Sequence, residues 1–228
     1  MQKISCFLPC RKGSERIINK NTKKFADHKD GLLEIKLNQL ERVEEIENIV
    51  VSTNDPKVIE IASNKIYSKV ELDLRPNNLA DSSTSTDELI SYVPGIIEKE
   101  HIIWTHVTSP FINENYYKKA ILKYFEIIQN KNFDSLMSVK KHRNFFWNTE
   151  GPINYDSSIE KWPRTQTLSP LYEINSGFFL CSRKLYVSLK DRIGKKPFFF
   201  NVDAADCFDI DWPEDFNMAE EIWRIRNE

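Results

Sequence analysis

The sequence predicts an α/β fold: a single Rossmann-like domain whose mostly parallel sheet is covered by helices on both faces. Short apolar runs alternate with amphipathic segments along most of the chain, and short buried strands joined by helices imply a parallel sheet. The chain has 228 residues, of which 40% are hydrophobic. Because domains contain roughly 100–200 residues, we expect one large domain over residues 1–228.

The first part of the chain supplies the clearest alternation. Leu33, Leu37 and Leu40 recur at helical spacing, and Pro56 suits the first turn of a helix. A helix interrupted near Pro94 is also expected. The expected strands are residues 3–9, 47–55, 101–110 and 133–139, and the expected helices are residues 31–43, 56–65, 86–100 and 113–128.

The regular alternation stops between Lys140 and about Pro170, where aromatic and polar residues are mixed. We expect this insertion to form an excursion such as a hairpin or an oligomer contact. Beyond it, the pattern indicates a strand over 173–183, a helix over 184–192, extended runs over 196–203 and 207–211, and a helix over 213–227.

Composition excludes several classes of protein. The formal net charge of -2 argues against a general nucleic-acid-binding protein, which would be basic. No apolar run approaches the roughly 18 residues of a membrane helix, and the N-terminus lacks the features of a signal peptide. Four cysteines without metal-type spacing indicate buried thiols in a reducing compartment: Cys6, Cys10, Cys181 and Cys207. We therefore expect a cytoplasmic protein without a membrane or nucleic-acid partner.

A cationic loop follows the first expected strand, in the stretch LPCRKGSERIINKN (residues 8–21). Four basic residues surround the pair Gly13-Ser14: Arg11, Lys12, Arg16 and Lys20. The loop lacks the dinucleotide-binding and P-loop fingerprints. A small-residue turn exposes backbone N–H groups, and these groups together with Arg and Lys side chains bind phosphates. The loop indicates either a phosphate site or a solvated basic surface.

A pair of carboxylates near the end of the chain predicts a second chemical centre. Asp209 and Asp211 lie two residues apart, so on an extended segment they point to the same side. Oxygen ligands beside phosphates suit Mg²⁺, although a polar strand end with one acid capping the last helix is the alternative. Ligands bind beyond the carboxyl ends of the strands in such sheets, so we expect four stretches to meet along one rim: residues 11–20, 52–55, 106–110 and 209–211.

The first loop resembles the first motif of the CMP-sialic acid synthetases (acylneuraminate cytidylyltransferases), IPARGGSKRIPRKN. The matching positions are Arg11, Gly13, Ser14, Arg16, Lys20 and Asn21. Further stretches resemble family segments in the same order: VVSTND, LRPNNLADSSTST, VTSPF, RTQ, NSGFF and FDIDWPEDF. Three positions depart from the family: Glu15 replaces Lys, Ile18 replaces Pro and His106 replaces Gln.

The resemblance implies a nucleotidyltransferase domain that joins CMP, from CTP, to an acidic nonulosonic sugar and releases pyrophosphate with Mg²⁺ as cofactor. It implies a homodimer in which the insertion reaches into the partner's site. By the same resemblance, the nucleotide-binding residues are Arg11, Gly13, Ser14, Arg16, Lys20, Asn21, Arg75, Ser82, Ser83 and Ser85. The sugar-binding residues are His106, Arg164, Gln166 and Asn175, and the metal ligands are Asp209 and Asp211. The catalytic residues are Arg11, Lys20 and Asp211.

Two other functions remain open from the sequence. An Asp-x-Asp pair on an α/β sheet is also used by glycosyltransferases that consume sugar nucleotides, although such enzymes usually carry the pair in mid-chain. The departures at Glu15 and His106 are compatible with a silent homologue that binds nucleotide without turnover. The sugar is equally open, since sialic, legionaminic, pseudaminic and octulosonic acids differ in substituents that a few side chains recognise.

Overall fold

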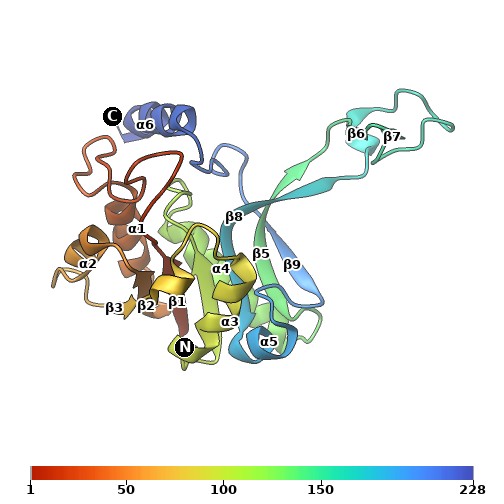
Figure 1. Ribbon diagram of the computed structural model, residues 1–228. Helices are drawn as coiled ribbons and strands as arrows, with labels where there is room; N and C mark the ends of the chain where they lie inside the picture. The colour runs from red at the N-terminus through yellow and green to blue at the C-terminus, as the bar shows by residue number, and fades with distance from the viewer. Residues whose placement is uncertain (1, 228) are drawn as a thin grey trace.

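A seven-stranded sheet forms the centre of the molecule in the computed structural model, which describes residues 2–227 (Figure 1). The strands follow the order β3-β2-β1-β4-β8-β5-β9. β8 is antiparallel to both of its neighbours, and the other pairings in the sheet are parallel. The strands are β1 (Ile4–Pro9), β2 (Ile46–Thr53), β3 (Val70–Leu74), β4 (His101–Thr105), β5 (Ser135–His142), β8 (Leu171–Ser182) and β9 (Pro197–Asn201).

Helices cover both faces of this sheet (Figure 1). α1 (Gly31–Glu41), α2 (Pro56–Ala62), α4 (Glu114–Gln129) and α6 (Pro213–Asn227) pack on one apolar cluster, and α3 (Thr86–Ile96) and α5 (Arg183–Leu189) pack on the other. Two short 3₁₀ turns complete the elements, Asn77–Leu79 and Thr165–Thr167. The predicted fold class, an α/β fold with a mostly parallel sheet, is confirmed.

Several helices begin at side chains that satisfy their free N–H groups. The carboxylate of Asp55 accepts a hydrogen bond from the backbone of Lys57 at the start of α2, and Pro56 occupies the first position of that helix. Asn113 caps α4, which follows directly on the loop after β4. These caps fix where the rim loops end and the helices start.

Three local predictions differ from the structure. β3 was not expected, because its alternating polar residues lie at the edge of the sheet and form no apolar run. Residues 207–211 form no strand; they are an irregular segment that crosses the rim. Pro94 does not interrupt α3. It lies inside the helix, two residues before the helix ends at Ile96.

The mid-chain insertion forms an arm that leaves the body beyond β5 and β8 (Figure 1). Pairing continues through Lys140 with Glu173 and His142 with Leu171, so β5 runs three residues beyond its predicted end and β8 begins two residues before its predicted start. We call residues 143–170 the arm; it contains the short hairpin of β6 (Trp147–Asn148) and β7 (Gly151–Pro152). The predicted hairpin-like excursion is therefore present.

The thiols follow the prediction from composition. Cys6, Cys10 and Cys181 are buried, Cys207 is half-buried, and none of the four is in a disulfide. Burial raises the pKa of Cys10 to about 12, so this thiol is unreactive at neutral pH. Within residues 2–227, no helix has the length and apolar character needed to cross a bilayer.

Candidate active site

The four stretches expected at the rim do meet at the carboxyl ends of the strands. The backbone N–H of Lys12 donates to Asn54 Oδ1 at 2.9 Å, which joins the first loop to the end of β2. The backbone N–H of Ile210 donates to the carbonyl of Thr108 at 2.9 Å, which joins the acidic segment to the loop after β4. The predicted convergence is confirmed, and it defines one continuous site.

The first loop turns at Gly13, whose φ of +81° lies in the left-handed region that favours glycine. Nη1 of Arg11 donates to the carbonyl of Gly13 at 3.0 Å, so the guanidinium folds over the turn. A hollow beside it is lined by Ser14, Glu15, Arg16, Lys20 and Asn21, among others. The loop thus gathers donors around one small concavity.

The basic loop and the acidic segment are in direct contact. Lys20 Nζ donates to the carbonyl of Ile210 at 2.8 Å and lies 3.4 Å from Asp211 Oδ1. Arg16 Nη2 donates to the same carboxylate oxygen at 2.9 Å. The Lys20 side chain is only 13% exposed, whereas that of Asp211 is 47% exposed. The cations that would hold phosphates, Lys20 and Arg16, therefore contact Asp211, one of the carboxylates that would hold a metal ion.

Asp209 lies on the inner side of the same segment. Ser109 Oγ is 3.5 Å from its carboxylate. Burial raises the pKa of Asp209, and the neighbouring Asp211 carboxylate raises it further, against a hydrogen bond from Thr108 and the charge of Lys20. Two adjacent carboxylates, one of them desolvated, fit a divalent cation with oxygen ligands. No group of three or more His, Cys, Asp or Glu side chains suited to a metal occurs within residues 2–227, so phosphate oxygens would have to complete such a site.

Arg75, expected near the cytidine, is buried and already bonded. Its guanidinium donates to the hydroxyl and the carbonyl of Ser52 at 3.0 and 2.8 Å. The Ser52 hydroxyl in turn donates to Asp73 at 2.6 Å. In this structure, Arg75 ties the ends of β2 and β3 together beneath the rim.

The three serines that follow Arg75 occupy different environments. Ser82 and Ser83 are exposed, and both the backbone N–H and the hydroxyl of Ser83 donate to Asp81 at 2.9 Å. Ser85 is the N-cap of α3: its hydroxyl accepts from the backbone of Glu88, whose carboxylate accepts from the backbone of Ser85. This reciprocal pair is a capping box. The bonds from Ser83 lower the pKa of the Asp81 carboxyl, and the hydroxyl of Ser82 also interacts with this carboxyl and acts in the same direction.

Replacing Ser85 by Ala is expected to lower the free energy of unfolding by about 1 kcal/mol, because the N-cap acceptor is lost. The KM for CTP should change less than about two-fold, since this hydroxyl serves the helix. Chemical denaturation and steady-state kinetics measure the two effects. Ser91→Ala, a change of the same kind inside α3 where the hydroxyl bonds to Asp87, is the matched control and should leave stability nearly unchanged. A large rise in KM without loss of stability would assign Ser85 to the nucleotide.

His106 follows β4 and is held as a neutral ring. Its Nε2 accepts a hydrogen bond from Trp104 Nε1 at 3.0 Å. Burial lowers the pKa of His106 to about 3, and the charges of Arg192, Lys20 and Lys36 act in the same direction. With Nε2 as the acceptor, we assign the ring proton to Nδ1. His106 can therefore donate one hydrogen bond, but it cannot serve as a charged acid at neutral pH.

Asn175 is buried at the root of the arm. Its side-chain oxygen accepts from the Ser138 hydroxyl at 2.5 Å and from the Gly177 backbone at 3.2 Å, and its amide lies 3.2 Å from Cys207 Sγ. Both ends of the side chain are thus engaged within the chain. A hollow beside it is lined by Lys140, Glu173, Asp209 and Asp211, among others, so Asn175 borders the site although its own polar atoms are bonded inward.

Arg164 and Gln166 lie elsewhere. Both are exposed on the arm, which projects away from the body in Figure 1. The backbone carbonyl of Gln166 accepts from Arg143, another residue of the arm. Within one chain, the structure therefore does not bring these two residues to Asp209 and Asp211.

Two charged residues near the site were missed in the sequence. Lys36 of α1 is fully buried, and its Nζ donates to the carbonyls of Ser109 and Ile112 at 3.0 Å each and to Tyr117 Oη at 2.7 Å. A signal for it existed: this lysine stands on the apolar stripe that contains Leu33 and Leu40. The other is Arg192, whose Nη1 lies 3.5 Å from His106 Nε2.

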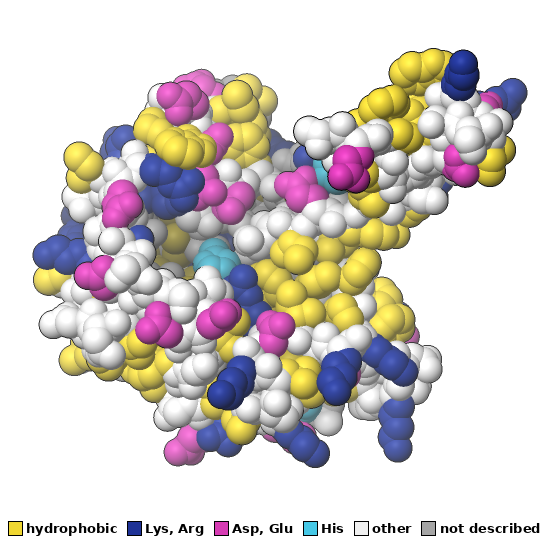
Figure 2. Space-filling view, turned by 45° about the vertical axis from the view of Figure 1, so that its right-hand side comes forward, with side chains coloured by type: hydrophobic (Ala, Val, Ile, Leu, Met, Phe, Trp, Pro, Cys, Tyr) yellow, Lys and Arg dark blue, Asp and Glu magenta, His cyan; other side chains and the backbone are white. Residues whose placement is uncertain are grey.

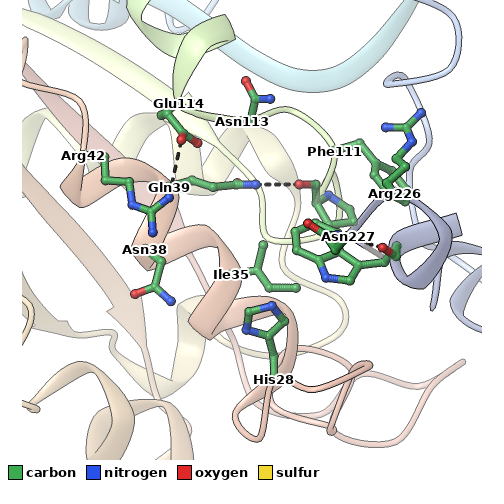
Figure 3. A pocket seen from close by; sticks show the side chains of 12 residues that line it. His28, Ile35, Asn38, Gln39, Arg42, Phe111, Asn113, Glu114, Arg226 and Asn227 are labelled. Atoms are coloured by element: carbon green, nitrogen blue, oxygen red, sulfur yellow. Dashed lines mark hydrogen bonds and ion pairs between the residues drawn. The ribbon is translucent and has the colours of Figure 1, made fainter. Parts of the chain in front are cut away.

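The outer side of the loop after β4 is braced by the same helix. Gln39 Nε2 donates to the carbonyl of Pro110 at 2.7 Å, and Arg42 lies 3.5 Å from Glu114 (Figure 3). These residues line a hollow between α1, this loop and α6 that also includes Phe111. α1 therefore fixes the position of the loop that carries Ser109.

The sheet and the basic and acidic segments at its rim are those expected of a nucleotidyltransferase, and the family match shows this class. Residues 5–226 match the family model described as cytidylyltransferase, and the chain belongs to that family.

Relatives agree with this assignment, and a solved structure shares the fold. The chain is 24% identical over 232 residues to the pseudaminic acid cytidylyltransferase of Campylobacter jejuni subsp. jejuni serotype O:23/36 (strain 81-176), covering 98% of this chain and 97% of that protein. It is 24% identical over 229 residues to the N-acylneuraminate cytidylyltransferase of Escherichia coli O18:K1:H7, covering 99% of this chain and 53% of that protein. The fold is similar to CMP:2-keto-3-deoxy-manno-octonic acid synthetase complexed with CTP, with a TM-score of 0.68, 15% identity, and 99% and 100% of the two chains covered.

Proposed function

We propose that this protein transfers CMP from CTP to the anomeric hydroxyl of an acidic nonulosonic sugar and releases pyrophosphate. The observation that carries the proposal is the contact between the basic first loop and the acidic segment, made by Lys20 and Arg16 with Asp211. The names of the relatives, which include a pseudaminic acid and an N-acylneuraminate cytidylyltransferase, support this class of sugar.

The chain's own residues position the reaction. Arg11, Lys20 and the backbone around Gly13 bind the β- and γ-phosphates, so the leaving pyrophosphate is held at the first loop. The anomeric oxygen attacks the α-phosphorus in line, a new P–O bond forms, and the bond to the β-phosphate oxygen breaks. The hydroxyl proton passes to the Asp211 carboxylate or to a hydroxide ion. Catalysis of this kind is mainly positioning and electrostatic stabilisation.

Asp209 and Asp211 would hold Mg²⁺ together with phosphate oxygens. When bound, this ion would neutralise charge that develops on the α-phosphate. In this structure Asp211 pairs with Lys20 and Arg16, which holds its carboxylate at the rim. Binding of CTP would redistribute these cations toward the phosphates.

The activity is tested by incubating the protein with CTP, Mg²⁺ and a panel of sialic, legionaminic, pseudaminic and octulosonic acids while pyrophosphate release is measured. The expected result is acid-dependent pyrophosphate and a CMP-sugar product. A protein that CTP stabilises against heat but that turns over none of the acids would contradict the proposal. So would transfer of a sugar from a preformed sugar nucleotide.

We further propose a homodimer in which the arm covers the partner's site. Large hydrophobic side chains are exposed on the arm, including Trp147, Ile159 and Trp162, and at its root on Ile174 and Phe199. Figure 2 shows hydrophobic side chains along the arm and over the body below its base. Exposed apolar area of this kind marks an interaction surface.

Replacing Ile159 and Trp162 together by Asp is expected to convert a dimer into a monomer, because two charges would have to be buried at the contact. Light scattering coupled to gel filtration gives the mass directly. Ile66→Asp, a change at an equally exposed apolar residue on the body, is the control and should leave the dimer intact. A wild-type protein that is monomeric at micromolar concentration would refute the proposed assembly.

A further inference from the structure

Arg192, in the loop between α5 and β9, places its guanidinium over two aromatic rings. The guanidinium carbon lies 3.9 Å from the ring centroid of Phe179 and 4.8 Å from that of Trp104. These two aromatic residues are register partners on β8 and β4, so they form one platform on the α3 and α5 side of the sheet. Cation–π contacts of this kind restrain the position of the guanidinium.

This guanidinium has almost no polar partner. Its single hydrogen-bond contact within residues 2–227 joins Nη1 to His106 Nε2 at 3.5 Å, the outer limit of such a bond. It forms no ion pair with a carboxylate there; the adjacent Asp191 accepts a bond from the backbone of Ile193 instead. Burial lowers the pKa of Arg192, yet a guanidinium stays charged at neutral pH. Asp191 acts on this guanidinium only through its charge at a distance, and a charge that is partly removed from water and forms no ion pair within the described residues favours an anion.

His106 supplies a second donor beside it. Because Nε2 is taken by Trp104, the free hydrogen-bonding group of the neutral ring is Nδ1–H. Arg192 and His106 therefore present donors only. Donors gathered in this way recognise a group that only accepts hydrogen bonds, and a carboxylate is such a group.

We propose that Arg192 binds the carboxylate of the acidic sugar, with the Nδ1–H of His106 donating to the same end of the substrate. This inference rests on the proposed function and assigns the sugar's charge to a residue of the body, whereas the resemblance assigns it to Arg164 of the arm. The phosphates of CTP are a less suitable ligand. Their cations follow β1, while Arg192 lies over β4 and β8 on the side from which the arm leaves.

The test is a cycle that changes the protein and the substrate together. Arg192→Met and the wild type are each assayed with the acid and with its neutral carboxamide. For the acid, we expect Arg192→Met to raise the sugar KM by about 10- to 100-fold with little change in the KM for CTP, since a charged hydrogen bond is lost. For the carboxamide, the two proteins should differ less than about three-fold. Arg192→Lys, which keeps the charge but not the planar fork, should lie between them.

Controls separate this inference from the proposed function. Arg164→Met is assayed in the same way with the acid and the carboxamide. If Arg164→Met raises the sugar KM for the acid alone, and Arg192→Met does not, the inference is overturned. Equal loss on acid and carboxamide for Arg192→Met also overturns it, because that pattern indicates a structural role. Thermal unfolding midpoints show whether Arg192→Met is misfolded. If it is, the comparison of acid with carboxamide is made with Arg192→Lys instead. A wild type that turns over no acid at all refutes the proposed function instead.

Discussion

Replacing Asp211 by Asn is expected to reduce CMP transfer about a thousand-fold or more while leaving the fold unchanged. Asn has nearly the same shape, and its oxygen can still accept from Arg16 and Lys20. The backbone N–H of Asp211 keeps its bond to Asp215 at 3.0 Å, so the start of α6 is preserved. The charge that would hold Mg²⁺ is lost, and loss of electrostatic stabilisation at a reacting phosphate costs about 10²- to 10³-fold even for one hydrogen-bond donor.

Pyrophosphate release measures this effect, and thermal unfolding confirms the fold. The Asp209→Asn variant should lose CMP transfer to a similar extent as Asp211→Asn. Asp203→Asn is the matched control and should keep its activity. Asp203 is an acid of the same segment that accepts from Tyr116 at 3.1 Å, outside the two-carboxylate pair. Near-normal turnover of Asp211→Asn at saturating CTP would reject the metal assignment. So would full wild-type activity in a strong chelator.

The sequence predicted the rim because strand ends are a local signal. A strand that stops at Pro9 or at Thr53 is visible as an apolar run followed by turn residues, and parallel pairing then brings the two ends together. The acidic pair and the basic loop followed from this rule. What the sequence could not provide was the direction of each side chain, and Asn175 illustrates this, since its amide faces inward.

Residues whose role depends on tertiary packing were missed. Arg192 stands in an irregular loop, and nothing within the loop indicates the platform of Trp104 and Phe179, which come from two other segments. Ser85 is the opposite case. The S-x-x-E pattern that it forms with Glu88 is a local capping signal, and it was available in the sequence.

Replacement of Lys36 is expected to have a large effect on stability. Replacing it by Met should lower the free energy of unfolding by about 2–5 kcal/mol at pH 7, because two buried carbonyls, those of Ser109 and Ile112, lose their donor. Tyr117 would keep its hydrogen bond with Thr105 at 2.8 Å. Since the loop from Ser109 to Ile112 adjoins Asp209, turnover should fall as well. Denaturant titration measures the stability, and Lys119→Met, at an exposed lysine of α4, is the control.

The pH dependence of this difference tests the burial of Lys36 more sharply. Burial lowers its pKa to about 7, whereas an unfolded lysine titrates near pH ~10.4. Between these values the unfolded chain binds more protons at this position, so this group makes the wild type more stable as the pH rises, by up to ~1.4 kcal/mol per pH unit. The buried thiols act in the opposite sense, since burial raises the pKa of Cys10 to about 12, but they are common to both proteins. The difference in unfolding free energy between wild type and Lys36→Met should therefore widen from pH 7 to pH 9. A difference that stays constant with pH would mean that Lys36 is not desolvated. Its hydrogen bonds to the loop from Ser109 to Ile112 would then not explain how that loop is held.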